Sequence, residues 1–221
     1  MAAKQGAPGK RRQPKAAPPA GHDATLSRDR IVATAVDLLD SEGVDGLTMR
    51  ALADRLGSGV MSLYWHVANK DDVFDLALDS VLEYREAPSG KDGGWREEAV
   101  HILEDWRARM LDHPWSASLL PRRALGASIL SRLELLGRAL SRAGVADADL
   151  NAAIWSLWNY VMGATITRAS FEVPYKERTA VQERLGEQHP TIERTRLLLD
   201  NDWDGAFRKG LDYLLDGLAP R

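Results

Sequence analysis

The sequence predicts an all-α fold. Leu and Ala dominate the composition, whereas Val, Ile, Thr, Tyr and Phe are sparse, and this balance favours helices over strands. Beyond residue 94 every apolar pattern recurs at helical spacing, and no strand pattern or internal repeat is visible. With 221 residues, 44% of them hydrophobic, the chain is long enough for one large or two modest domains with a buried core.

The composition also excludes several classes of protein. No run of eighteen apolar residues predicts a membrane-spanning helix, and the N-terminus lacks the apolar centre of a signal peptide. The absence of cysteine excludes disulfides, cysteine nucleophiles and zinc fingers. The five histidines show no paired metal-ligand spacing. We therefore expect a soluble cytoplasmic protein without a membrane partner, a metal site or a cofactor.

The charge divides the chain into a basic and an acidic part. Residues 1–70 contain ten Lys or Arg against seven Asp or Glu, whereas residues 71–221 contain nineteen against twenty-five. Residues 1–24 are rich in Ala, Pro, Gly, Lys and Arg and cannot bury a core, so we predict a disordered basic tail. The tail is either merely solvated or follows the phosphates of a nucleic acid. Residues 25–70 and 71–221 are the two predicted helical domains.

The first helix is expected to follow Ser27, a good N-cap, and to end at Gly43 in a left-handed C′ position. Its apolar stripe consists of Ile31, Ala35, Leu38 and Leu39. Thr48 is the predicted N-cap of a second helix, which Gly57 ends.

A third helix is predicted from Val60 to His66, with Leu63 and Val67 on its buried side. The short helices on either side of the Gly57-Ser58-Gly59 turn are typical of a helix-turn-helix.

Asn69 is the predicted N-cap of a fourth helix that runs to about Tyr84, and residues 86–94 form a connection. Four apolar stripes then predict four longer helices. They cover residues 95–110, residues 129–140 closed by Gly144, residues 150–170 and residues 203–218.

The exposed side of the helix-turn-helix carries the candidate DNA contacts, because a recognition helix places its early positions near base edges in the major groove. Ser62 can donate to several bases, Val60 and Met61 can touch a thymine methyl, and Arg50 can bind a guanine or a phosphate. Tyr64 and Lys70 are expected on phosphates, while His66 either joins them or caps its helix. For Trp65 we favour simple packing. The candidate set is Thr48, Arg50, Ser58, Val60, Met61, Ser62, Tyr64, Trp65, His66 and Lys70.

The segments Gly-Leu-Thr-Met-Arg-Ala-Leu-Ala at 46–53, Leu56-Gly57, and Leu-Tyr-Trp-His-Val at 63–67 followed by Lys70 carry a family resemblance. Over residues 25–85 the chain resembles the DNA-binding domain of the TetR family of bacterial transcriptional repressors, and its Tyr-Trp-His-Val form is most like the tetracycline-repressor branch. It departs from the family pattern at Gly59, Val60 and Met61. The resemblance therefore implies DNA binding but leaves the operator sequence open.

The C-terminal part resembles the same branch more loosely, at His113-Pro114-Trp115 and at residues 210–217. The resemblance implies a homodimer that reads a palindromic operator in double-stranded DNA and is released by a small-molecule effector. We expect this effector to be largely apolar and to act by shifting the fourth helix. The expected dimer interface is Ile154, Leu157, Val161, Phe207, Leu211, Leu214, Leu215 and Leu218.

Large aromatic and scattered polar side chains in the C-terminal part are the candidates to line the effector pocket. They are His101, Trp106, Met110, Trp155, Trp158, Asn159, Met162 and Thr165. Each could equally be ordinary core, with His101 paired to Asp105 on its own helix.

The alternatives to a repressor are few. No Ser-His-Asp order, phosphate-binding glycine loop or carboxylate pair occurs in a setting that predicts an enzyme, so we expect no catalytic residues. A non-switching activator or architectural protein with the same DNA-binding domain stays open. A metal or haem sensor is disfavoured by the absence of cysteine and the dispersed histidines.

Overall fold

The computed structural model describes residues 26–84, 94–123, 125–185, 188–199 and 202–218, and these residues form helices and connections without a strand. The all-α prediction is confirmed. The tail predicted at 1–24 and nearly all of the connection at 86–94 lie outside the described residues.

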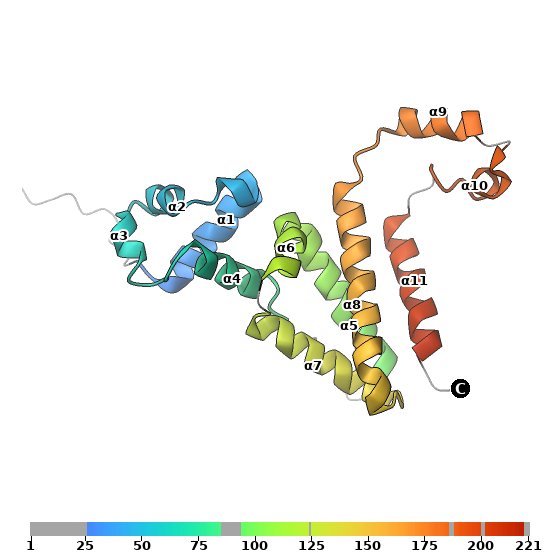
Figure 1. Ribbon diagram of the computed structural model, residues 1–221, viewed down its shortest axis with the longest axis horizontal. Coiled ribbons are helices and arrows are strands. Elements are labelled where there is room, and N and C mark those ends of the chain that lie inside the picture. Colours follow the sequence, from blue (N-terminus) through green and yellow to red (C-terminus); the bar gives the residue numbers. More distant parts are fainter. Residues whose placement is uncertain (1–25, 85–93, 124, 186–187, 200–201, 219–221) are drawn as a thin grey trace, which may run out of the picture.

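Four helices form the N-terminal domain, which occupies the left of Figure 1: α1 (Arg28–Gly46), α2 (Met49–Leu56), α3 (Val60–Leu63) and α4 (Lys70–Val81). The three predicted N-caps are confirmed. Ser27, Thr48 and Asn69 each accept a hydrogen bond from a backbone N–H in the first turn of the helix that follows. The predicted apolar stripe of α1 is buried throughout.

Three helices of this domain differ from their predicted length. Continuous helix in α3 ends at Leu63 rather than at His66, and the chain continues in a tighter turn in which the His66 amide donates to Leu63 O at 2.8 Å. Helix α4 ends at Val81 rather than near Tyr84. Helix α1 continues to Gly46 rather than ending at Gly43, although Gly43 interrupts it with a positive φ of 71°.

The C-terminal part contains three long helices around a common core, α5 (Trp95–Asp112), α7 (Ala127–Arg142) and α8 (Asp147–Ser170). Helix α5 packs against both others, and Ile102, Leu103, Trp106 and Met110 on it are fully buried. Helix α11 (Trp203–Leu218) lies beside α8, as Figure 1 shows. None of the described helices is long and apolar enough to cross a membrane.

The sequence patterns missed four short elements. Helix α6 (Pro114–Leu119) and the 3-10 turn η1 (Leu120–Arg122) continue from the end of α5. Helices α9 (Tyr175–Leu185) and α10 (Pro190–Thr195) project beyond the end of α8 in Figure 1. No buried residue is found on α10, so no apolar stripe marks it in the sequence.

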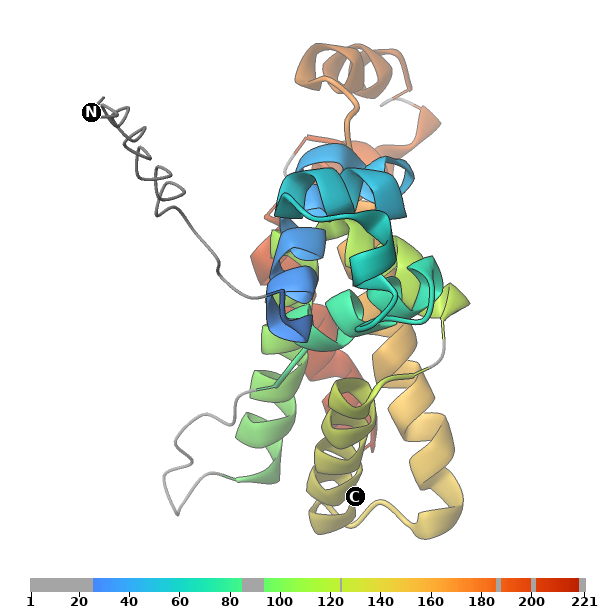
Figure 2. The ribbon, with the colours of Figure 1, turned by 90° about the vertical axis from the view of Figure 1, so that its left-hand side faces the viewer.

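The two parts meet through α1, α4, α6 and α7. Helix α4 packs along α1 and also contacts α7, while α6 contacts both α1 and α8. Figure 2 shows α1 to α4 facing the viewer, with α7 and α8 extending downward beyond them. Helix α4 therefore belongs to the packing of the N-terminal domain although it also reaches the C-terminal one.

Candidate nucleic-acid interface and its connection to the C-terminal domain

A tight turn between α2 and α3 positions the candidate interface. Thr48 Oγ1 accepts the Ala51 amide at 3.0 Å and fixes the start of α2. Gly57 adopts the left-handed conformation, φ 66° and ψ 31°, and its amide donates to Ala53 O and Asp54 O. A side chain would be strained at this φ, so glycine permits the reversal that presents α3 to solvent.

The exposed surface of α3 and the following turn is apolar to an unusual degree. Met61 is 76% exposed, Tyr64 46% and Trp65 87%, whereas Leu63 and Val67 are buried. The packing expected for Trp65 is wrong, because Leu63 and Val67 already fill the inward side of this segment. An indole left in water next to a methionine and a tyrosine indicates a surface that is covered in a complex.

The polar candidates of the helix-turn-helix are mostly exposed as well. Thr48, Arg50, Ser62 and His66 are exposed, and Val60 is half-buried. Arg50 makes no hydrogen bond or ion pair with any residue that the structure describes, so its guanidinium is available. Lys70 is half-buried in the first turn of α4, with its ammonium 5.0 Å from the Phe74 ring centroid.

Ser58 differs from the other candidates. It is half-buried, and its Oγ is covered without a hydrogen-bond partner in the described structure. This hydroxyl lies inside the turn rather than on the exposed surface, which does not favour the base contact expected of it.

A carboxylate of α1 bonds directly to the C-terminal part. Asp40 accepts hydrogen bonds from His113 Nδ1 at 2.9 Å and from Trp115 Nε1 at 2.6 Å. Trp115 is 6% exposed, so its N–H has little access to water. These hydrogen bonds connect α1 to the junction of α5 and α6.

A second connection joins the loop after η1 to α4. Arg123 donates to Asp75 at 2.7 Å and to Asp71 at 2.7 Å, and it also reaches Asp71 O at 2.8 Å. The hydrogen bond that Arg123 donates to Asp75 is the main reason why the pKa of Arg123 lies above its ordinary value. At the next turn of α4, Asp79 accepts the amide of Ser128 at 2.7 Å. One face of α4 is thus bonded along its length to the C-terminal part.

Arg132 of α7 forms the third connection and is fully buried. Its guanidinium donates to Leu82 O at the end of α4, to Ile102 O of α5 and to the Asp105 carboxylate, all within 3.0 Å. Burial lowers the pKa of Arg132, and Asp105 opposes this effect. The sequence carried a signal for this residue, since it lies on the same apolar stripe of α7 as Ile129 and Leu136.

The eight candidates for the effector pocket divide between the core and the surface of the C-terminal part. Trp106, Trp155 and Trp158 pack edge to face, with ring centroids 4.7 Å and 5.5 Å apart. However, His101, Trp155 and Asn159 are exposed, whereas Trp106, Met110, Trp158, Met162 and Thr165 are buried. The expected pairing of His101 with Asp105 is wrong.

His101 lies instead against the Tyr84 ring, at a centroid distance of 6.0 Å. Asp105 is already used by Arg109 and Arg132.

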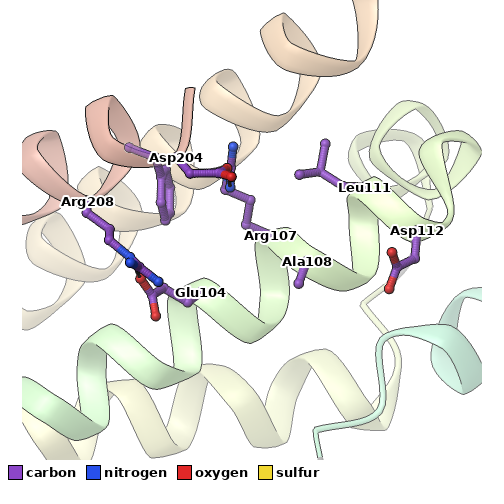
Figure 3. Close-up of a pocket in the computed structure, with 8 residues that line it drawn as sticks. Glu104, Arg107, Ala108, Leu111, Asp112, Asp204 and Arg208 are labelled. Atoms are coloured by element: carbon purple, nitrogen blue, oxygen red, sulfur yellow. Dashed lines mark hydrogen bonds and ion pairs between the residues drawn. The ribbon is translucent and has the colours of Figure 1, made fainter. Parts of the chain in front are cut away.

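A cavity of about 430 Å³ opens between α5 and α11, at a place that the sequence patterns did not indicate (Figure 3). Its lining includes Glu104, Arg107, Leu111, Asp204, Phe207 and Arg208. Ion pairs across it join Arg107 to Asp204 at 2.8 Å and Arg208 to Glu104 at 2.6 Å. Only tertiary structure brings these residues together, because about a hundred positions separate the two helices in sequence.

Most residues expected at a dimer interface lie in the core of the protomer instead. Leu157, Val161, Phe207, Leu211 and Leu215 are at most 3% exposed, and Ile154, Leu214 and Leu218 are half-buried. The five buried residues belong to the packing of α8 and α11 within one chain, so the expectation that they face a second copy is wrong. Ile154, Leu214 and Leu218 stay predicted interface residues.

The contact between Tyr160 and Phe207 illustrates this packing. Their rings stack with centroids 5.4 Å apart, and the Tyr160 hydroxyl donates to Phe207 O at 2.9 Å. Burial raises the pKa of the Tyr160 phenol, so the group stays a neutral donor.

Comparison with known proteins gives two family matches. Residues 31–77 match the model for bacterial regulatory proteins of the tetR family, and residues 87–221 match the tetracyclin repressor-like C-terminal domain. An HTH-type transcriptional regulator of Saccharopolyspora erythraea is 39% identical over 200 residues, with 88% of this chain and 85% of that protein aligned. The HTH-type transcriptional repressor DrrR1 of Streptomyces coeruleorubidus is 34% identical over 220 residues, with 91% of this chain and 80% of that protein aligned.

Solved structures agree with these matches. The TetR family protein ActR of Streptomyces coelicolor, in complex with (S)-DNPA, superposes with a TM-score of 0.77 at 30% identity, over 88% of this chain and 98% of that chain. BioQ with its double-stranded DNA operator superposes with a TM-score of 0.63 at 31% identity, over 89% of this chain and 99% of that chain.

Proposed function

Because this chain belongs to the TetR family of bacterial regulatory proteins and is a DNA-binding transcriptional regulator rather than an enzyme, we propose that it is a ligand-released repressor. In this proposal a homodimer occupies a palindromic operator and blocks transcription until a small molecule binds the C-terminal domain. DrrR1 is a repressor by name, ActR has been solved with a small molecule, and BioQ has been solved on its operator.

The exposure of Met61, Tyr64 and Trp65, together with that of Arg50, carries the proposal. In the proposed complex, α3 enters the major groove and Val60, Met61 and Ser62 meet base edges. Arg50 binds a guanine or a nearby phosphate. Thr48, Tyr64, His66 and Lys70 hold the backbone, and Trp65 covers the sugar-phosphate edge of the groove.

The outer faces of α8 and α11 are the proposed dimer interface. Trp155 is 49% exposed, Ile166 42% and Tyr213 66%, and no charged residue occurs between Leu150 and Thr167. A Cβ at Gly163 would meet nothing within 4 Å, so the backbone of α8 is open to close approach by a mate. Two copies packed on these faces form a four-helix bundle with a two-fold axis.

Release of DNA is proposed to follow from the three connections between the domains. An effector that moves α5, α6 or α7 displaces the groups bonded to Asp40 of α1 and to Asp75 and Asp79 of α4. In this way it shifts α1 and α4 together. Coupling of about 1–3 kcal/mol would lower operator affinity roughly 5- to 150-fold.

A truncation and a reporter test the proposal. Removing residues after Leu199 deletes α11, so we expect monomers with little affinity for DNA flanking the gene of this protein. A stable dimer after the cut contradicts the interface. A reporter on the adjacent promoter separates repression from activation, since repression requires higher output when the gene is deleted.

A further inference from the structure

The cavity between α5 and α11 contains a buried cation that is incompletely bonded. We propose that Arg107 binds the carboxylate of an acidic small molecule with an apolar body, and that this carboxylate takes the place of Asp204. The assignment rests on the proposed effector-binding role of the C-terminal domain, and it names the chemical class of the effector.

Arg107 has unused hydrogen-bonding capacity. Its side chain is 10% exposed, and its Nη1 donates to Asp204 Oδ1 at 2.8 Å. Its Nε is covered and has no partner among the described residues. A guanidinium offers five donors in a planar fork that fits a carboxylate through two parallel bonds. A buried cation held by a single bond therefore favours a second, better-placed anion.

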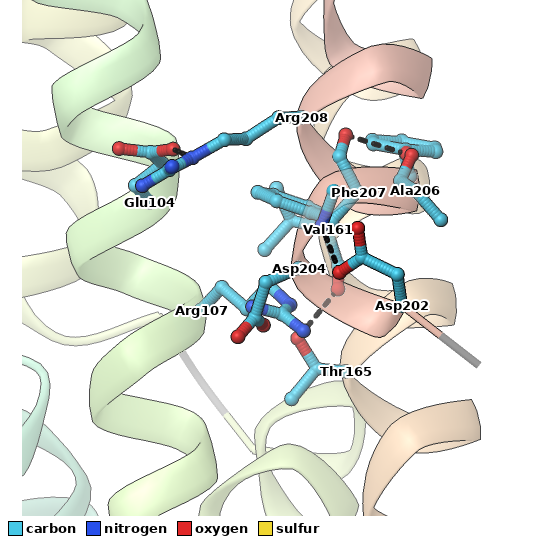
Figure 4. A network of polar contacts seen from close by, with 11 residues as sticks. Glu104, Arg107, Val161, Thr165, Asp202, Asp204, Ala206, Phe207 and Arg208 are labelled. Carbon is cyan, nitrogen blue, oxygen red and sulfur yellow. Dashed lines mark hydrogen bonds and ion pairs between the residues drawn. The ribbon is translucent and has the colours of Figure 1, made fainter.

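Asp204 is suited to give way to such an anion. Its side chain is 79% exposed, so the carboxylate recovers its hydration when it leaves Arg107. It lies in the first turn of α11, where a negative charge is stabilised by the helix dipole even without the arginine. Figure 4 shows Asp204 reaching from α11 to the guanidinium of Arg107.

The rest of the cavity selects the body of the ligand. Ala108, Leu111 and Phe207 supply apolar lining, and the Phe207 ring centroid lies 4.7 Å from the Arg107 guanidinium carbon. Glu104 and Arg208 neutralise each other at the rim. The Asp112 carboxylate lies at the far end of the lining on α5 (Figure 3). Its negative charge would repel a second acid group on the ligand. A monocarboxylate with a compact apolar body fits, and about 430 Å³ suits a small organic molecule.

The position of this cavity connects it to DNA binding. Asp112 directly precedes His113, whose ring bonds Asp40 of α1. A ligand that spans Arg107 to Leu111 therefore lies within two residues of a contact with the DNA-binding domain.

Binding of simple acids to the full-length protein tests the site without DNA. The probes are benzoate, cyclohexanecarboxylate and 1-naphthoate, each compared with its neutral amide by titration calorimetry. We expect at least one acid to bind roughly tenfold or more tightly than its amide, because a charge-assisted pair is lost in the amide. Equal affinity of acids and amides, or no binding of any acid, overturns the proposal.

Three variants locate the site. Asp204→Asn removes the internal competitor and should tighten acid binding several-fold, whereas a purely structural Asp204 would leave binding unchanged or weaken it. Arg107→Gln should weaken acid binding at least tenfold. Arg138→Gln, on the exposed face of α7 and outside the cavity, should change it less than twofold. Circular dichroism confirms that each variant is folded, and Asp204→Asn tests the proposal even where Arg107→Gln fails to fold.

The outcomes also separate this site from the proposed repressor function. Acids that bind through Arg107 but leave operator affinity unchanged support the site and contradict release by this ligand. Compounds that release DNA while no acid binds at Arg107 contradict the site and support release by another ligand.

Discussion

Trp115 Nε1 lies 2.6 Å from Asp40 Oδ1, so a buried indole of the C-terminal domain donates directly to a carboxylate on the first helix of the N-terminal domain. The same carboxylate accepts a hydrogen bond from His113 Nδ1 at 2.9 Å. Because one side chain of α1 serves two donors from the other domain, the orientation of α1 depends on the position of the α5–α6 junction.

Replacing Asp40 by alanine should destabilise the protein and weaken the coupling between its domains. The substitution leaves the Trp115 N–H without an acceptor in a site that is 6% exposed, which costs about 1–3 kcal/mol. Urea unfolding measures this loss. Asp37→Ala is the control, since Asp37 is also exposed on α1 and should change stability by less than about 0.5 kcal/mol. If both substitutions lower the free energy of unfolding equally, the hydrogen bond between Asp40 and Trp115 does not stabilise the protein.

Replacing Arg132 by methionine should destabilise the protein much more. The change removes the donor to Leu82 O and Ile102 O in a fully buried site and leaves Asp105 with Arg109 alone, at a cost of about 3 kcal/mol. Arg138→Met, on the exposed face of α7, is the control. Its free energy of unfolding should lie within about 0.5 kcal/mol of that of the parent in the same experiment. If Arg132→Met lowers the free energy of unfolding no more than Arg138→Met does, the hydrogen bonds of Arg132 to α4 and α5 do not stabilise the protein.

Trp65→Ala should weaken operator binding without loss of stability. The indole is 87% exposed in the free protein, so its removal uncovers no core. Thermal unfolding and fluorescence anisotropy with labelled operator measure the two properties. Leu130→Ala, which removes a 54% exposed side chain from α7, is the control. Unchanged operator affinity would remove Trp65 from the interface.

Lys70→Ala should lower the affinity for all DNA sequences alike and reduce the slope of log affinity against log salt by about one. Lys176→Ala, in an exposed position on α9, should leave the slope unchanged. Substitutions of Val60 or Ser62 should instead change which sequence is preferred, because these residues face base edges in the proposed complex. A Lys70→Ala variant that keeps the parent slope contradicts a phosphate contact.

Gly163→Arg should convert the proposed dimer to monomers. A Cβ at Gly163 meets no atom within 4 Å, so the start of the new side chain is accommodated in the protomer, whereas the full arginine blocks a mate on α8. Light scattering gives the oligomeric state, and Leu130→Arg on α7 is the control for the added charge and bulk. A dimeric Gly163→Arg variant would require an interface away from this face.

Local features of the sequence predicted the local structure correctly. Ser27, Thr48, Asn69 and Gly57 act through bonds and backbone angles within one turn, so their roles can be recognised without the tertiary fold. The apolar stripes likewise predicted the long helices, since a helix buries the face that its periodicity marks.

Features that depend on packing between helices were predicted less well. Helix α8 is apolar on several sides, and only its packing against α5, α6, α7 and α11 decides that Leu157 and Val161 turn inward while Trp155 stays exposed. The exposure of Trp65 reverses the usual preference of large aromatic residues for the core. Arg107 and Asp204 come from helices far apart in sequence, so no spacing pattern joins them.

Protection mapping on the DNA that flanks the gene of this protein tests the central claim most directly. The account predicts one protected segment with two inverted half-sites whose centres lie about 34–36 Å, one helical turn, or a multiple of that distance apart. It also predicts that Gly163→Arg and Trp65→Ala each reduce the protection. A single asymmetric site, or protection that both variants preserve at parent concentration, would contradict binding by a dimer through the exposed α3 surface.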